Sequence, residues 1–342
     1  MKAAILKAFG APLGVERMDD PLAGPGEAVI RVVACGIDGT DLKLLDGFGY
    51  APELPFVMGH EPAGVVESVG PGVSGWSPGD RVVPYIFLVP VASPWYRSER
   101  EQLASDLAGV IGVKAHHGGY AERLVVPAHQ LVRIPDAVSL RDAAVHCDAG
   151  LTAYHAVRRG RLQPGETALI IGAGGVGSFA IQYARLAGAT VLAAERTPAK
   201  LAWAQQLGAN AAVAEDVPDF ARQRTAGRGV DCVLDIVGTS ATWSTALASV
   251  AAGGRIVVVG YTPDAFTLSG KWLAQNEIEV LGSRAGSRTE LEEALGLAAG
   301  GKVRSIITDS MPLDRVNEAL AQLREGNVLG RMVLDVTTTG AR

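Results

Sequence analysis

The pattern of hydrophobic and polar residues divides the chain into two regions of different character. In the middle of the chain, six short apolar runs alternate with segments of helical length: 167–171, 190–194, 211–214, 230–237, 255–260 and 278–282. Strands that are covered on both faces are apolar along their whole length, and strands that alternate with helices pair in parallel. The central region is therefore predicted to be α/β, with a doubly wound parallel sheet of six strands.

The first 150 residues have a different pattern. Glycine and proline separate short runs in which apolar and polar residues alternate: 27–35, 64–69, 80–85 and 119–126. Such alternation predicts a mostly antiparallel β domain. We therefore expect a β domain over 1–150, completed by about 286–342, and an α/β domain over 151–285.

A glycine-rich loop follows the first apolar run of the central region. Gly172, Gly174 and Gly177 fit the pattern G-x-G-x-x-G, and residues 176–187 read as a helix that Gly188 can terminate. The first glycine permits a tight turn, the second allows the backbone to approach a pyrophosphate, and the third lets helix and strand pack closely. With the six predicted strands, the loop indicates a Rossmann domain that binds a dinucleotide.

The next run ends in Glu195, 21 positions after Gly174, where the dinucleotide fingerprint has an acidic residue for the ribose hydroxyls. A carboxylate there repels a 2′-phosphate and favours NAD over NADP, although Arg196 could hold that phosphate. The remaining predicted cofactor residues are Gly175, Val176, Lys200 and Gly260. Asp235, which ends the fourth strand, is a further candidate for the cofactor cleft.

The composition argues against several classes of protein. The chain has 342 residues, 48% of them hydrophobic, and a net charge of −5, which gives no reason to expect nucleic acid as a partner. No apolar run is long enough for a signal peptide or a membrane span, and three scattered cysteines form no disulfide framework. We expect a reduced, cytoplasmic enzyme.

Four further motifs accompany the glycine loop: Gly-Ile-Asp-Gly-Thr-Asp-Leu-Lys at 36–43, Met-Gly-His-Glu-Pro-Ala-Gly at 58–64, Pro-Gly-Asp-Arg-Val at 78–82, and Cys-Asp-Ala-Gly-Leu-Thr-Ala-Tyr at 147–154. In this order and spacing, and with the ending Gly-Arg-Met-Val-Leu at 330–334, the chain resembles the medium-chain, zinc-type alcohol dehydrogenase family. The resemblance implies a GroES-like catalytic domain beside the Rossmann domain.

The resemblance implies a catalytic metal at Asp38, His60 and Asp148. His60 matches the family's histidine ligand, whereas Asp38 and Asp148 occupy the positions of its two cysteine ligands. Cys35 and Cys147 lie near those positions without matching them. The segment 88–118, which holds a second, structural zinc in many relatives, contains no cysteine, so we expect no structural Zn²⁺ and a lobe in which Trp95, Tyr96 and Leu103 pack by hydrophobic contact.

The resemblance also implies catalytic roles for four residues. His60 and Glu61 lie at the metal, Thr40 matches the hydroxyl that contacts the alcohol oxygen, and Lys43 stands where relatives often carry the outer histidine of a proton relay. A lone lysine in a loop is also often a solvated charge.

Two interpretations of the carboxylates remain open. Asp38, Asp148 and Glu61 beside His60 could hold a divalent ion, for which carboxylates favour harder ions than thiolates do. Alternatively, the metal has been lost and the aspartates are ordinary hydrogen-bonding residues. Because three buried carboxylates without a cation must raise their pKa values or recruit a partner such as Lys43, the cluster favours Zn²⁺ or another cation.

The sequence thus predicts an NAD(H)-dependent enzyme that transfers hydride between the cofactor and an alcohol or carbonyl substrate. One alternative is a zinc-independent medium-chain reductase of a quinone, enone or iminium, and another is a nucleotide-binding protein without catalysis. The candidate substrate-lining residues are Phe48, Tyr50, Trp95 and Tyr120. By resemblance, we expect a homodimer or homotetramer.

Overall fold

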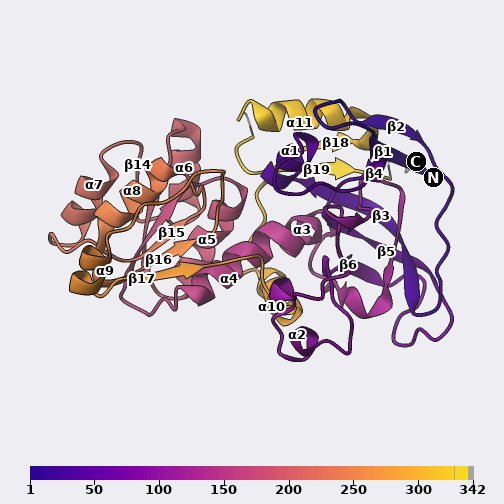
Figure 1. Ribbon diagram of the computed structural model, residues 1–342, viewed down its shortest axis with the longest axis horizontal. Coiled ribbons are helices and arrows are strands. Elements are labelled where there is room, and N and C mark those ends of the chain that lie inside the picture. The colour runs from indigo at the N-terminus through magenta and orange to yellow at the C-terminus, as the bar shows by residue number, and fades with distance from the viewer. Residues whose placement is uncertain (327, 338–342) are drawn as a thin grey trace. The chain divides into compact units, whose positions relative to one another are not determined.

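The computed structural model describes residues 1–326 and 328–337 (Figure 1). The chain forms two compact units. The terminal unit comprises Met1–Asp148 and Gly286–Arg342, and the central unit comprises Ala149–Ala285.

The central unit contains a six-stranded parallel sheet in the order β14-β13-β12-β15-β16-β17. Its strands are β12 (Thr167–Ile171), β13 (Thr190–Ala194), β14 (Ala211–Val213), β15 (Val230–Asp235), β16 (Val250–Val258) and β17 (Glu279–Gly282). Its helices are α4 (Leu151–Arg159), α5 (Gly175–Leu186), α6 (Pro198–Gln206), α7 (Val217–Arg224), α8 (Ser240–Ser249) and α9 (Gly270–Asn276). The predicted doubly wound sheet is confirmed, and its order reverses at β12, where such folds bind ligands.

The apolar runs form the strands because their side chains are buried on both faces of the sheet. All five residues of β12 are buried, and Leu169, Leu192, Val233 and Ile256 join Trp243 of α8 in one core cluster. Dense packing of such side chains is the main contribution to the stability of a core.

Two helices of this unit were not predicted. Helix α7 begins after Asp216, which has a left-handed backbone, and α7 buries only Ala221 completely. Helix α9 has no buried residue and ends at Glu277, which is also left-handed. Both helices carry few apolar residues: Val217 and Phe220 of α7, and Trp272 and Leu273 of α9, lie partly buried against the core in otherwise mostly polar segments.

The terminal unit is built around β3 (Glu27–Ile37), an eleven-residue strand. The main sheet has the order β11-β6-β5-β3-β19-β18, and β10 also pairs with β3. Its remaining strands are β5 (Glu61–Val69), β6 (Arg81–Pro84), β10 (Arg123–Pro127), β11 (Leu131–Arg133), β18 (Ile307–Pro312) and β19 (Arg331–Asp335). All pairs in this sheet are antiparallel except β18 with β19, so the predicted antiparallel domain is confirmed.

Two small sheets and several helices complete this unit. The strands are β1 (Lys2–Leu6), β2 (Gly14–Arg17) and β4 (Phe56–Val57) in one sheet, and β7 (Phe87–Leu88), β8 (Gly109–Ile111) and β9 (Ala115–His116) in the other. The α-helices are α1 (Gly39–Leu45), α2 (Pro94–Arg97), α3 (Leu140–Val145), α10 (Arg288–Ala299) and α11 (Val316–Arg324). Short 3₁₀ turns lie at Glu101–Leu103, Ala128–Gln130 and Leu313–Arg315, and a π-helix lies at His146–Gly150.

The prediction of a strand over 119–126 was wrong for the first half of that range. Residues Gly119 and Tyr120 donate their backbone N–H groups to the carbonyls of Gly59 and Met58, and the strand proper begins only at Arg123. These backbone groups are satisfied by a loop that is distant in sequence, which alternation of side chains does not reveal. Among the described residues, no helix is long and apolar enough to cross a membrane.

We expect Leu169→Ala to lower the free energy of unfolding of the central unit by about 2–5 kcal/mol, because it leaves a cavity in a closed core. Leu169 is fully buried, whereas Leu186 at the end of α5 is 46% exposed. Denaturant unfolding of both alanine variants measures the difference, and the matched control Leu186→Ala should change stability by less than about 0.5 kcal/mol. Equal losses in the two variants would contradict the assigned core.

Candidate functional site

Three segments of the terminal unit bring a histidine and three carboxylates together. Asp38 lies at the end of β3 and caps α1, His60 and Glu61 lie at the start of β5, and Asp148 lies in the π-helix. One ligand atom from each of these four residues lies within 4.8 Å of the others. The predicted metal residues Asp38, His60 and Asp148 are thus neighbours, and Glu61 joins them.

Hydrogen bonds to neighbouring residues fix the position of Asp38. Its carboxylate accepts the backbone N–H of Thr40 at 2.7 Å, and the carboxylate of Asp41 accepts the N–H of Asp38 at 3.0 Å. This reciprocal arrangement is a capping box, which orders the first turn of α1. Thr40 and Lys43 follow on the same short helix, and both side chains are partly buried.

His60 lies at the centre of the cluster. Its Nε2 atom is 3.5 Å from Oδ1 of Asp38 and 3.6 Å from Oδ2 of Asp148, and its Nδ1 atom is 3.5 Å from Oδ1 of Asp41. The side chain is 3% exposed, and neither ring nitrogen has a hydrogen-bond partner among the described residues. A buried nitrogen without a partner, facing two carboxylates, suits a bound cation.

Asp41, which was not predicted as a site residue, contributes to this site. It is fully buried behind the imidazole, on the side away from Asp38 and Asp148. Carboxylates in this position fix the orientation of a histidine ligand. The capping-box spacing of Asp38 and Asp41 was a signal that could have identified it.

Arg331 supplies the positive charge that the sequence analysis expected from a partner such as Lys43. The guanidinium is 4% exposed, forms an ion pair with Glu61, and lies 4.0 Å from Asp38. Arg331 belongs to β19, about 270 residues after Glu61, and β19 pairs with β3. Its place in the ending motif was visible in the sequence, but its role required the pairing of these strands.

Burial and charge shift the pKa values of the cluster in opposite directions. Burial raises the pKa of Glu61 to about 8, although Arg331 opposes this shift. Burial also disfavours the charged form of Asp38, but His60 and Arg331 outweigh it and lower the Asp38 pKa. Burial disfavours imidazolium at His60, but Asp38 and Asp41 raise its pKa well above the usual range. The cluster therefore strongly favours positive charge at its centre.

The central unit carries the predicted glycine loop. Gly172 has a positive φ of 94°, and a Cβ atom on Gly177 would lie 1.8 Å from the Gly172 carbonyl oxygen. Helix α5 begins at Gly175 and Val176, and the residue before it, Gly174, makes no side-chain cap. The first N–H groups of α5 are therefore available for an anion.

Glu195 lies at the carboxyl end of β13, next to this loop. Its carboxylate accepts N–H groups from Ala173 at 3.1 Å, Arg196 at 2.9 Å and Thr197 at 3.2 Å. The acid is thus held against the glycine loop as the fingerprint requires. Arg196 is exposed and Lys200 is partly buried on α6.

Gly260 follows the sheet's fifth strand, and a Cβ atom there would lie 2.3 Å from the carbonyl oxygen of Ile236. Asp235 is fully buried and accepts the N–H groups of Val237 and Gly238 and the hydroxyl of Thr242. These contacts assign Asp235 to the support of a loop, which differs from its predicted place in a cofactor cleft.

The chain matches two families along its length: the alcohol dehydrogenase GroES-like domain at residues 24–136 and the zinc-binding dehydrogenase at residues 175–300. It is 35% identical to an alcohol dehydrogenase of Geobacillus stearothermophilus over 98% of this chain and 100% of the relative. It is 34% identical to an NAD-dependent alcohol dehydrogenase of Sulfolobus acidocaldarius, with the same coverage.

The chain belongs to the zinc-type medium-chain alcohol dehydrogenase family. The crystal structure of the alcohol dehydrogenase from Aeropyrum pernix has the same fold, with a TM-score of 0.93, 33% identity, and coverage of 98% of this chain and 100% of that chain. A further relative is the acryloyl-coenzyme A reductase of Metallosphaera sedula, 30% identical over 98% of this chain and 99% of the relative.

The cysteines of this family member are not in the ligand cluster. The Cys147 Sγ donates to the Ala144 carbonyl of α3 at 3.0 Å and lies 3.9 Å from the His60 carbonyl oxygen, and Cys35 is fully buried. Burial raises the pKa of both thiols well above the usual range. Since a thiolate is the form that binds metal, the raised pKa values disfavour either thiol as a ligand.

The side chains of the lobe over 88–118 do not all pack as predicted. Leu103 is 39% exposed, so it does not hold the lobe together by hydrophobic contact. Trp95 and Tyr96 are half-buried, and Tyr96 meets His129 edge-on at 5.8 Å. Glu101 is instead buried, which the polar sequence of this segment did not suggest.

The prediction that Tyr120 lines a substrate pocket was also wrong. Tyr120 is fully buried, and its ring lies under Gly59, where a Cβ atom would come within 2.4 Å of it. Tyr120 therefore supports the turn that carries His60. Phe48 and Tyr50 are partly exposed.

At a pH above about 8, where the Glu61 carboxyl is charged, we expect Arg331→Met to destabilise the terminal unit by about 3–5 kcal/mol, because it leaves that buried carboxylate without its Arg331 partner. Adding Glu61→Gln in the same chain removes that charge and should recover more than half of the loss. Thermal and denaturant unfolding of both variants tests this. A double variant no more stable than Arg331→Met would contradict the importance of the ion pair.

Proposed function

We propose that this family member is an NAD(H)-dependent oxidoreductase that interconverts an alcohol and a carbonyl compound with the help of a divalent ion. The observation that carries this proposal is the buried His60 Nε2, without a hydrogen bond and facing the carboxylates of Asp38 and Asp148. The similarity to alcohol dehydrogenases supports the same reaction.

The donor set fits a divalent cation. Imidazole and carboxylate both bind zinc, and the replacement of thiolates by carboxylates favours harder ions and weaker retention of zinc. Asp38, His60 and Asp148 would hold the ion, and Glu61, paired with Arg331, would lie beside it. A bound ion supplies Lewis acidity, which lowers the pKa of an alcohol oxygen.

The surrounding residues would position the reaction and move its proton. Asp41, whose Oδ1 lies 3.5 Å from Nδ1 of His60, would orient the imidazole from behind. The Thr40 hydroxyl would accept the alcohol proton and pass it outward toward Lys43 or solvent. Burial lowers the pKa of Lys43, which brings this amine closer to the range in which it can exchange a proton.

The glycine loop and Glu195 would hold the cofactor. The free N–H groups at the start of α5 would bind the pyrophosphate, and the Glu195 carboxylate would accept the ribose hydroxyls. Bound nicotinamide supplies the hydride acceptor or donor, while the protein supplies orientation.

A second candidate is reduction of an activated carbon–carbon double bond without a metal. The acryloyl-coenzyme A reductase relative favours it, and so does the absence of cysteine from the ligand cluster in the described part of the chain. In that case Thr40, His60 or Lys43 would donate the proton directly. If no substrate reacts, the chain would instead be a nucleotide-binding protein without catalytic activity.

The test of the metal-assisted reaction combines metal analysis with an NADH-coupled assay over alcohols, carbonyls and enones, before and after chelation. We expect about one divalent ion per chain, and chelation should lower alcohol turnover at least about tenfold, with recovery on adding zinc or a harder ion. Less than about a tenth of an ion per chain, with chelator-resistant reduction of an enone, would instead establish the second candidate.

The matched variants are Asp38→Asn and Asp136→Asn. Asparagine is as good a helix cap as aspartate, so Asp38→Asn keeps the N–H bond of Thr40 while it removes a ligand charge. We expect metal content and turnover to fall at least about tenfold in Asp38→Asn. The fully exposed Asp136 is the control, and its variant should retain both.

Glu195→Gln tests the cofactor assignment. We expect the KM for NAD to rise about tenfold while the KM for NADP falls, because the charge that repels a 2′-phosphate is lost. Arg196→Gln should raise the KM for NADP only. Steady-state kinetics with both cofactors measures the changes, and an unchanged NAD/NADP ratio in Glu195→Gln would refute this role.

A further inference from the structure

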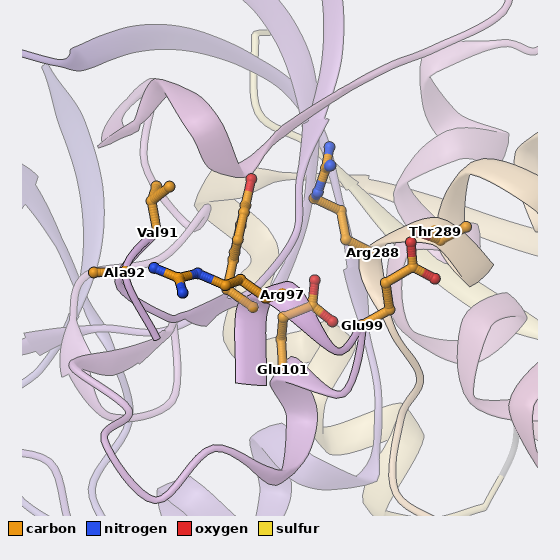
Figure 2. A pocket seen from close by; sticks show the side chains of 8 residues that line it. Val91, Ala92, Arg97, Glu99, Glu101, Arg288 and Thr289 are labelled. Carbon is orange, nitrogen blue, oxygen red and sulfur yellow. The ribbon is translucent and has the colours of Figure 1, made fainter. Parts of the chain in front are cut away.

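A pocket lies within the terminal unit, outside the residues assigned to metal and nucleotide. It has a volume of about 710 Å³, within the range of small-molecule sites. Its lining comes from the segment around α2 and from the start of α10: Val91, Ala92, Tyr96, Arg97, Glu99, Glu101, Arg288 and Thr289 (Figure 2).

Two polar atoms in this lining, one of an acid and one of a base, are buried without a hydrogen-bond partner among the described residues. Glu101 is 3% exposed, and its Oε2 atom accepts no hydrogen bond. The Nε atom of Arg288 is also buried and donates none, although the same guanidinium donates to Glu292 at 3.0 Å. Native proteins satisfy nearly all such atoms, so one orphan acceptor and one orphan donor indicate a missing partner.

The rest of the lining combines an apolar wall with balanced charge. Val91 is 53% exposed at the rim, and the Tyr96 ring is fixed between His129 and the Arg288 guanidinium, which lies 5.9 Å from the ring. Arg97 and Glu99 add one charge of each sign. In Figure 2 the Glu101 carboxylate points from the floor toward the middle of these side chains.

We propose that this pocket binds a small zwitterion of the amino-acid type, an aminocarboxylate with an apolar substituent. Its ammonium would donate to Glu101, its carboxylate would accept from Arg288 and Arg97, and its substituent would rest on Tyr96 and Val91.

A zwitterion would provide a hydrogen-bond partner for both of these atoms, whereas an amine or an acid alone would provide only one. An amine leaves Arg288 Nε without an acceptor, and an acid leaves Glu101 Oε2 without a donor. Burial raises the pKa of Glu101, which an adjacent ammonium would counteract by favouring the carboxylate. This site is separate from the proposed oxidoreductase chemistry, since none of its residues belongs to the metal cluster or the glycine loop.

Isothermal titration calorimetry on the full chain at neutral pH, without cofactor, tests the proposal. The probes are leucine, phenylalanine and glycine, together with 3-methylbutylamine and 4-methylpentanoate, each of which keeps one charged group of leucine. We expect at least one amino acid to bind with a Kd of about 1 mM or tighter, and its amine and acid analogues to bind at least about tenfold more weakly. Equal binding of the amine or the acid would overturn the zwitterion, and no binding of any amino acid at about 20 mM would overturn the site.

Glu101→Gln should weaken amino-acid binding at least about tenfold, whereas Glu293→Gln, an exposed change on α10, the helix that begins at Arg288, should leave it unchanged. Should Glu101→Gln fold poorly, Ala92→Trp decides the question, because it fills the pocket from an exposed position and should abolish binding. Retained binding in Ala92→Trp would place the ligand elsewhere and overturn the proposal. Because these measurements involve no turnover, their failure would leave the oxidoreductase proposal intact.

Discussion

The stability of the terminal unit depends on how its buried negative charges are balanced by positive charge. Three carboxylates and a histidine gather near the ends of interior strands of its main sheet, and Asp41 adds a fourth carboxylate behind the ring. Such a cluster is tolerated only if positive charge is brought into it. Arg331 supplies one such charge at Glu61, and the space between His60, Asp38 and Asp148 is suited to a second.

Strand pairing makes this compensation possible. β19 carries Arg331 to the side of β3, whose end carries Asp38, while β5 carries His60 and Glu61 on the other side of β3. Three segments from the beginning and the end of the chain therefore fix one charge cluster. The capping box of α1 orders Asp38, and the buried Tyr120 packs under the turn that carries His60.

In the central unit the constraint is different, because two backbone segments of the glycine loop and helix α5 must approach each other closely. Gly177 has no room for a side chain beside Gly172, and this proximity brings the start of α5 onto the end of β12. Glu195 then binds the loop through Ala173. These relationships are local in the chain, within about 25 residues, which explains why the sequence revealed them so fully. The weakly amphipathic α7 and α9, by contrast, carry little signal of their own.

The sequence by itself determined the two-part architecture, the six-stranded sheet, the glycine loop and the residues Asp38, His60, Glu61 and Asp148, because periodicity and short motifs are encoded in neighbouring positions. Only the tertiary structure decided that Arg331 balances Glu61, that Asp41 supports His60, and that Tyr120 and Asp235 serve as supports. The physical reason is that charge compensation and burial depend on distances in space, and residues 270 positions apart can satisfy each other only after the strands have paired.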